Sequence, residues 1–271
     1  MTDGVLQAHA RGIVTAAAVS PCGAAFEEAV ERLREAPGLD VGIHWVLVGE
    51  RPLSPPEKIP SLLGEGGALL PGARAFARRY LFGGLRWAEV EREMRLQLER
   101  LLAAGLPVVH ANGHQHLHLL PKVFEIALRL AEEHRVPWVR VPAEPAAGFG
   151  SPRGVEISVL NALGRRARRR LARAPGVAAP EATVGVLDAG RLDFERLVRA
   201  LLQVRGTSEL VCHPGLREAD LALSYDWDYH WEAETAALCD PRLRPLLAEA
   251  GIELTSFSRL GGASASLPGS A

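Results

Sequence analysis

Short apolar segments alternate with longer amphipathic segments along most of the 271-residue chain. The amphipathic segments carry apolar residues at every third or fourth position, which predicts helices with one buried face. The apolar runs bounded by Gly, Pro, Asp or charged residues predict strands. The predicted helices are Ala24–Glu35, Trp87–Leu102, Lys122–His134, Val155–Ala172, Phe194–Val204 and Pro241–Ala250. The predicted strands are Ile13–Val19, Val41–Val48, Leu106–Ala111, Pro137–Val141, Thr183–Leu187, Glu209–Cys212 and Ile252–Ser256.

Strands that alternate with helices predict parallel pairing and an α/β fold. Seven strands in a chain of this length favour a (β/α) barrel, incomplete or complete, over an open doubly wound sheet. No GxGxxG follows the first strand and no GxxxxGK[ST] is present, which weakens the nucleotide-binding open sheets. We expect one domain over residues 1–260 and a disordered tail over 261–271. The Pro- and Gly-rich stretch Gly49–Gly84 predicts a long excursion, a candidate lid beside a binding site.

Composition narrows the class of protein further. The chain is 48% hydrophobic and 23% charged, which excludes a disordered or fibrous protein, and its net charge of −1 gives no general attraction to nucleic acid. The one basic run, Arg165–Arg173, is interpreted as a solvated helix face rather than a phosphate contact. Three cysteines without a CxxC pair exclude a disulfide scaffold and indicate a reducing compartment. With neither a signal pattern nor an apolar run of about 20 residues, we expect a cytoplasmic protein without a membrane span.

The strongest chemical signal is a cluster of histidines. Four of the nine, His110, His114, His116 and His118, fall within nine residues of the segment VVHANGHQHLHLLP, which leaves the carboxyl end of a predicted strand. In a barrel that end forms the catalytic face. While the chain stays extended, these side chains would share one side, because side chains alternate along a strand. Neutral imidazoles in such a group suit a borderline divalent metal; the alternative is a polar loop with incidental histidines.

Two further histidines occupy equivalent places in other strands. His44 lies in VGIHWVLV, and His213 ends ELVCHPG. A barrel would bring His44, His114 and His213 to one rim, the arrangement that metal hydrolases need. Taken singly, His44 could be a core residue and His213 a turn residue, and we interpret the remaining histidines (His9, His134, His230) as structural.

The segments GIHWVLVGERPL, HANGHQHLHLLP, VRVPAEP and ELVCHPG, in this order, resemble the YdjC-like carbohydrate deacetylases, and most closely the hopanoid-biosynthesis-associated branch. The resemblance covers nearly the whole chain. It implies a deviant, TIM-like (β/α) barrel and a divalent-metal-dependent hydrolase that removes acetyl groups from N-acetylated sugars or glycolipids. It places a Mg²⁺ or Zn²⁺ ion on His44, His114 and an N-terminal acidic residue, and proton transfer on His213. It assigns substrate contacts to His116, His118 and Arg140.

The chain departs from the family pattern at two places. Met1 corresponds to a position past the Ala-Asp-Asp-Phe-Gly motif, so that the first strand and its carboxylates are missing; either the start was assigned too late or the chain is an inactive member. Asp3 follows that strand and is not a predicted ligand. Asn112 stands where the family usually has Asp, which keeps an acceptor but loses its charge. We therefore expect weak metal binding, low turnover, and lowered stability or self-association into a homo-oligomer through the open edges.

Two other functions compete with the deacetylase. The first is a carbohydrate- or metal-binding relative without catalysis, with Trp45, Trp227 and Tyr229 as sugar-stacking rings. The acidic residues beside those rings, Asp226 and Asp228, are interpreted as ordinary surface. The second is a metallophosphoesterase of the same barrel type, which would need Asp ligands among the histidines. HANGHQHLHLLP offers none, so this function ranks last.

Overall fold

The computed structural model describes residues 1–144, 152–225 and 227–261. The strands are β1 (Ala16–Val19), β2 (Asp40–Trp45), β3 (Val108–Gly113), β4 (Trp138–Val139), β5 (Ala182–Val184) and β6 (Ser208–Leu210). The α-helices are α1 (Thr2–Arg11), α2 (Phe26–Arg34), α3 (Ala73–Leu81), α4 (Trp87–Ala103), α5 (Pro121–Glu133), α6 (Pro152–Leu171), α7 (Phe194–Leu201), α8 (Glu218–Ser224), α9 (Trp231–Leu238) and α10 (Leu243–Glu249). Short 3₁₀ turns are η1 (Pro56–Lys58), η2 (Pro60–Leu62), η3 (Glu65–Gly67) and η4 (His114–Leu119).

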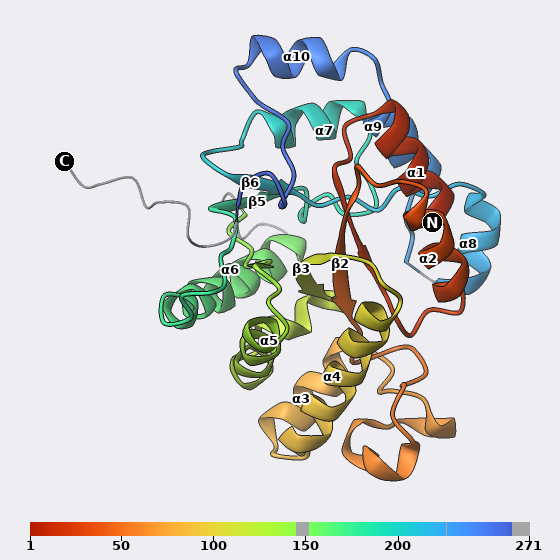
Figure 1. Cartoon of the computed structure of the whole chain (residues 1–271), viewed down its shortest axis with the longest axis vertical. Coiled ribbons are helices and arrows are strands. Elements are labelled where there is room, and N and C mark those ends of the chain that lie inside the picture. Colours follow the sequence, from red (N-terminus) through yellow and green to blue (C-terminus); the bar gives the residue numbers. More distant parts are fainter. Residues whose placement is uncertain (145–151, 226, 262–271) are drawn as a thin grey trace.

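The strands pair in parallel and in the order of the sequence. One sheet has the order β1-β2-β3-β4, and a second pairs β5 with β6. Figure 1 shows the strands near the centre of the molecule with helices around them. This singly wound order, with helical crossovers, confirms the predicted α/β fold. In the described ranges β1 pairs only with β2, and β4 does not pair with β5, so these strands do not close the predicted barrel.

The helices that the apolar periodicity predicted most strongly are confirmed. Along α4, the side chains of Val90, Met94, Leu98 and Leu101 are fully buried on one face. Helix α5 begins at Pro121, whose missing N–H is not needed at a first helical position. These two helices contact each other and cover the sheet, with α4 packed against β2.

The excursion Gly49–Gly84 contains η1–η3 and α3 and packs on α4. Ile59, Leu62 and Phe76 are fully buried. Glu93 of α4 is also buried, and its carboxylate accepts hydrogen bonds from the backbone N–H groups of Leu53 (2.9 Å) and Ser54 (2.8 Å). A buried carboxylate needs such partners, so Glu93 fastens the start of the excursion to the helix. From this segment, Glu50 and Ala73 line the cavity described below.

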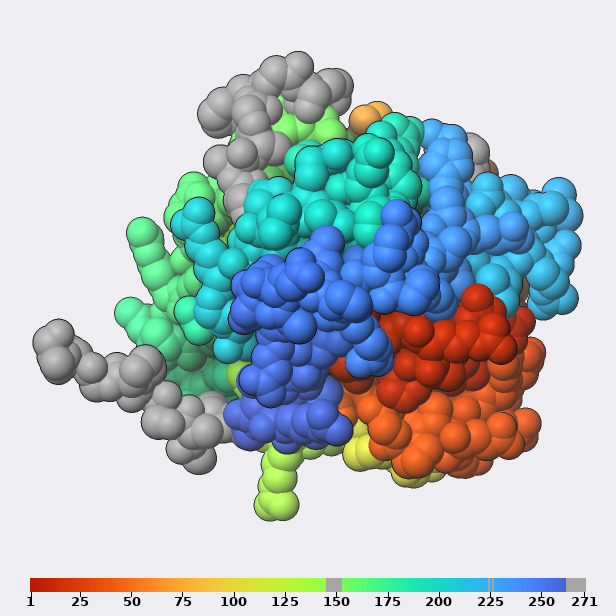
Figure 2. All heavy atoms as spheres, turned by 90° about the horizontal axis from the view of Figure 1, so that it is seen from above, coloured from red at the N-terminus to blue at the C-terminus, as the bar shows by residue number. Residues whose placement is uncertain are grey.

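One predicted element is wrong, and some of the helices were not predicted. The predicted strand Ile252–Ser256 is not a strand: the Ile252 N–H continues the end of α10 by bonding to the Leu247 carbonyl, and the segment has no ladder partner among the described residues. Helix α3 lies within the excursion, and α8 and α9 follow β6 without having been predicted. Helix α9 packs against α1, so that a helix late in the chain lies beside the first one (Figure 2).

Two sequence interpretations are settled by local contacts. In the basic run of α6, Arg168 donates to the backbone carbonyls of Val141, Pro180 and Glu181, and Arg170 forms an ion pair with Glu125 (2.6 Å). The other arginines of the run (Arg165, Arg166, Arg169 and Arg173) are exposed, which agrees with the predicted solvated helix face. The proposal that Trp45 stacks on sugar is wrong, because its ring is 1% exposed and its Nε1–H donates to the Met94 carbonyl (3.0 Å).

No helix in the described ranges is long and apolar enough to cross a bilayer. The predicted tail, residues 261–271, lies outside the described residues apart from Gly261, as does Asp226. The predicted extent of a single domain, 1–260, stays a prediction.

Candidate active site

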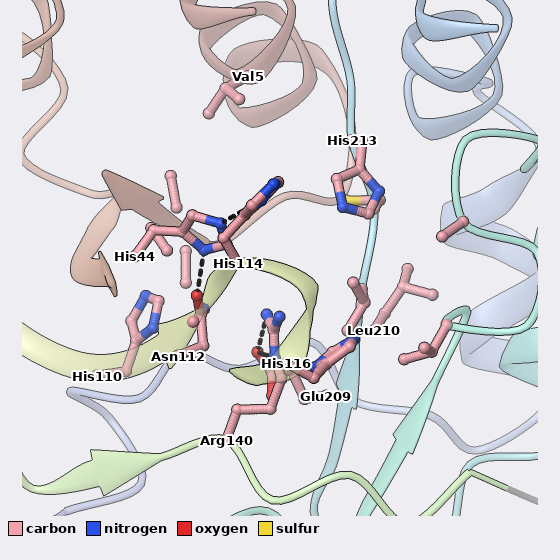
Figure 3. A pocket seen from close by; sticks show the side chains of 18 of the residues that line it. Val5, His44, His110, Asn112, His114, His116, Arg140, Glu209, Leu210 and His213 are labelled. Atoms are coloured by element: carbon pink, nitrogen blue, oxygen red, sulfur yellow. Dashed lines mark hydrogen bonds and ion pairs between the residues drawn. The ribbon is translucent and has the colours of Figure 1, made fainter. Parts of the chain in front are cut away.

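A cavity of about 1390 Å³ lies at the carboxyl ends of β2, β3 and β6. The walls carry His44, His110, His114, His116, Arg140 and His213 together with many apolar side chains. Figure 3 shows how side chains from these separate strands converge on this cavity. Within these walls the imidazoles of His44 and His114 lie close together, as polar groups do in sites that orient a small ligand.

His44 and His114 face one another at the mouth of this cavity. His44 is paired across β2 and β3 with Asn112, and the Nδ1 atom of His44 lies 2.6 Å from the Asn112 Oδ1 atom. We assign the proton to Nδ1, because an amide oxygen can only accept. The Nε2 atom of His44 can then only accept, and it lies 3.4 Å from Nδ1 of His114, which is within hydrogen-bond distance. Burial, followed by the nearby His114, lowers the pKa of His44 to about 3, so the ring is neutral at pH 7.

His213 stands across the cavity from this pair, after the end of β6 (Figure 3). Its Nδ1 atom is buried and has no hydrogen-bond partner among the described residues. Burial and then the positive charge of Arg140 lower its pKa to about 4. Its backbone N–H donates to the carboxylate of Glu234 (3.2 Å), a buried residue of α9. His213 is therefore held in place and neutral, with a nitrogen available for a proton or a ligand.

The histidines of the window 110–118 do not share one side, contrary to the expectation from strand alternation. The strand ends at Gly113, and Gln115 and His116 adopt positive φ values of 50° and 54°, which turn the chain. His110 remains below, stacked on Phe257 with ring centroids 4.4 Å apart. Only His114 and His116 of the window reach the cavity together with the more deeply placed His110.

The predicted substrate contacts occupy different positions. His116 lines the cavity, and its Nδ1 atom is buried and unpartnered among the described residues. Arg140 also lines it, and donates to Glu209. His118 lies behind Arg140, where its Nε2 atom bonds to the Arg140 carbonyl (2.9 Å), and it is not on the cavity wall. A substrate contact by each of the three stays a prediction.

The pair His44–His114 fits part of a zinc site. Nitrogen ligands about 2.0–2.1 Å from a tetrahedral zinc lie about 3.4 Å from each other, and the two facing nitrogens are separated by that distance. Asn112 supplies the outer hydrogen bond that ligating histidines usually make. However, no group of three or more His, Cys, Asp or Glu side chains suited to a metal occurs within the residues that the structure describes. These residues supply two ligands, and water or substrate would have to supply the others.

Sequence reasoning missed three residues of this site. Asn112 was noted only as a departure from a family pattern, whereas it fixes the His44 ring. Glu209 and Glu234 bind Arg140 and the His213 backbone. The charged residue that begins the apolar strand ELVCHPG was a signal for Glu209, but nothing local indicated that its partner would be Arg140, 69 residues away.

The order of strands and the histidine-lined cavity at their carboxyl ends define a singly wound, parallel α/β protein. Its family follows from comparison with known sequences. The chain belongs to the YdjC-like protein family, whose model matches residues 1–249. The predicted resemblance to this family is confirmed.

Individual relatives agree with this assignment. A carbohydrate deacetylase of Geobacillus stearothermophilus is 30% identical over 256 residues, which are 94% of this chain and 89% of the relative. A chitooligosaccharide deacetylase of Serratia marcescens is 28% identical, covering 95% of this chain and 92% of the relative. A crystal structure from Enterococcus faecalis, described as that of a proposed cellobiose-phosphate cleavage protein, superposes with a TM-score of 0.73. It covers 96% of this chain and 92% of the other chain at 23% identity, which supports the fold alone.

Proposed function

We propose that this protein is a metal-dependent hydrolase that removes the acetyl group from an N-acetylated sugar or glycolipid. The observation that carries the proposal is the facing pair His44–His114, with nitrogens 3.4 Å apart, at a cavity that also holds the Nδ1 atom of His213, which has no partner in the described part of the chain. The names of the relatives, which are carbohydrate and chitooligosaccharide deacetylases, supply the substrate class. The histidines supply groups that such a hydrolysis requires.

We further propose that His44 Nε2 and His114 Nδ1 hold a divalent ion. When bound, such an ion lowers the pKa of a water molecule and polarises the acetamide carbonyl. Two neutral imidazoles favour Zn²⁺ over Mg²⁺, which prefers oxygen ligands. Asn112 keeps the Nδ1 proton of His44 in place, so that the Nε2 lone pair points toward His114.

The remaining side chains handle protons and exclude water. His213, neutral at pH 7, would take up the proton that the attacking water loses and deliver it to the amine nitrogen as the C–N bond breaks. The ring of Trp227 lies 5.5 Å from that of His114, and the ring of Tyr229 lies 5.2 Å from that of His213. These two rings therefore pack against the histidines. A hopanoid-linked glycolipid as the substrate is a narrower proposal that rests on the motif resemblance.

Acetate release tests the proposal directly. The protein, freed of metal with a chelator and reloaded with Zn²⁺ or Mg²⁺, is incubated with N,N′-diacetylchitobiose, and acetate is measured by an enzyme-coupled assay. We expect release that requires added metal and is faster with Zn²⁺. Release at the same rate from chelator-treated protein would contradict a metal-dependent mechanism.

Asn112 offers a test of the metal ligands that does not need turnover. Replacing Asn112 with alanine should weaken Zn²⁺ binding about 10- to 100-fold, because it removes the acceptor that fixes the ligating His44 ring. Asn112→Asp keeps an acceptor of the same shape and should bind Zn²⁺ at least as well as the wild type. Competition with a chromophoric chelator measures both affinities, and equal affinity in the alanine variant would show that His44 does not depend on Asn112.

A binding protein without catalysis is the second candidate. It is favoured by the fact that no third metal-binding side chain joins His44 and His114 in the described part of the chain. Binding of N,N′-diacetylchitobiose in calorimetry, without acetate release under any metal, would support it over the hydrolase.

A further inference from the structure

Arg140 and Glu209 form an ion pair in the wall of the cavity, away from the facing histidines. Glu209 is the middle residue of β6, and Arg140 directly follows β4. The Arg140 Nε and Nη2 atoms lie 2.9 and 2.6 Å from Oε1 of Glu209. The side chains are only 13% and 9% exposed. A buried ion pair is a costly feature for stability alone, which makes a role toward a ligand worth testing.

The geometry of the pair leaves one carboxylate oxygen unused. Both nitrogens of Arg140 donate to the same oxygen, Oε1, rather than one to each. The other oxygen, Oε2, is buried and has no hydrogen-bond partner among the described residues. Leaving a buried charged oxygen without a donor carries a desolvation cost that no bond offsets. A ligand that brings a donor to this oxygen would recover that energy.

A second unsatisfied polar atom borders the same cavity. The Nδ1 atom of His116 is buried and unpartnered among the described residues, and the charge of Arg140, after burial, keeps the pKa of this ring low. Figure 3 shows His116, Arg140 and Glu209 grouped on the side of the cavity below His44 and His114. The cavity thus has two polar regions, one with the facing imidazoles and one with a carboxylate acceptor beside a guanidinium.

We infer that Arg140, Glu209 and His116 form the subsite that binds hydroxyl groups of the sugar ring, with Glu209 Oε2 accepting a hydrogen bond from one hydroxyl. This inference rests on the proposed function and specifies how its substrate is recognised. Neighbouring hydroxyls of a pyranose can donate to Oε2 while accepting from the Arg140 guanidinium, whereas an acetyl carbonyl can only accept and an alkyl chain can do neither. A site built to bond a hydroxyl discriminates strongly against an analogue that lacks it. Glu209 would therefore determine specificity rather than take part in bond breaking.

Binding measurements with deoxygenated sugars test this subsite without requiring turnover. Calorimetry on the zinc-loaded protein would compare methyl N-acetylglucosaminide with its 3-deoxy, 4-deoxy and 6-deoxy analogues. We expect one analogue to bind wild type about 10- to 100-fold more weakly, as for a lost hydrogen bond to a charged group. Glu209→Gln should weaken the parent sugar to a similar degree and no longer distinguish that analogue from it. The matched control is Glu195→Gln, since Glu195 lies exposed on α7 outside the cavity.

The outcomes separate this inference from the proposed function. If Glu209→Gln keeps the wild-type preference among the analogues, or if wild type shows no preference or binds none of these sugars, the subsite is overturned. A melting curve shows whether the Glu209→Gln variant folds. If it does not, the affinities of the wild type for the sugar and its deoxy analogues test the subsite by themselves. Sugar binding with hydroxyl selectivity but without acetate release would overturn the deacetylase and leave the subsite standing. If Glu209→Gln lowered kcat equally for every substrate and left binding unchanged, Glu209 would act as a proton acceptor, which would contradict our inference.

Discussion

Replacement of His114 by alanine is expected to lower kcat/KM for acetate release from N,N′-diacetylchitobiose by more than about 100-fold. The variant would lose a ligand of the proposed metal ion, which would stabilise the negative charge that develops in the transition state. His114 supplies one of the two facing nitrogens, and His44 alone would hold a metal ion weakly. Zn²⁺ binding should weaken in parallel when measured by chelator competition. The side chain is only partly buried, so the melting temperature should change little.

The matched control for this variant is His134→Ala. His134 caps the end of α5, does not line the cavity, and was interpreted from sequence as structural. We expect the activity and zinc affinity of this variant to stay at the wild-type level. If His114→Ala retained wild-type acetate release, or if both variants lost activity equally, the facing pair would not be the reacting centre.

Acid is expected to destabilise the protein through its buried histidines. Burial lowers the pKa of both His110 and His118 to about 4, against about 6.5 in the unfolded chain. Between these values the unfolded state binds more protons, so the free energy of unfolding falls as the pH falls below 6.5. At pH 5 each of the two histidines should lower the free energy of unfolding by about 2 kcal/mol relative to neutral pH, or by about 4 kcal/mol together.

A comparison of variants separates the contribution of a buried histidine from that of groups whose effect on stability changes with pH in the opposite direction. Burial raises the pKa of Glu234 to about 8, and stability from that group is lost as the pH rises from about 4.5 toward 8. His110→Phe, which keeps a ring against Phe257, should therefore make the pH dependence of unfolding shallower by about 2 kcal/mol between pH 7 and 5. Urea unfolding at several pH values measures this, with His134→Gln as the control. A His110→Phe curve parallel to wild type would mean that His110 is already protonated in the folded protein or exposed to solvent.

Residue patterns near in sequence predicted local structure well. The three- to four-residue spacing of apolar residues along α4 and α5 predicted both helices and their buried faces, because residues at that spacing lie on one side of a helix. Their alternation with apolar runs predicted the parallel α/β sheet. The same reasoning failed for Ile252–Ser256, because an apolar run forms a strand only where another strand is available to pair with it.

The site was predicted in part. His44, His114 and His213 were chosen because they follow or end separate strands, and the structure brings them to one cavity. The histidine window was treated as extended throughout, whereas the turn at Gln115 and His116 separates His110 and His118 from the cavity mouth. Strand alternation holds only while the backbone stays extended, and the sequence did not mark where β3 ends.

The order of residues by itself determined the class of fold, the helices with one apolar face, and the set of imidazoles at strand ends. Only the tertiary structure decided which side chains meet: Asn112 with His44, His114 opposite that ring, and Glu209 with Arg140. Each of these pairs joins residues about 70 positions apart in the chain. Local spacing records whether a side chain is buried, but the partner and the direction of a buried polar group depend on strand register and on loops that pack from elsewhere.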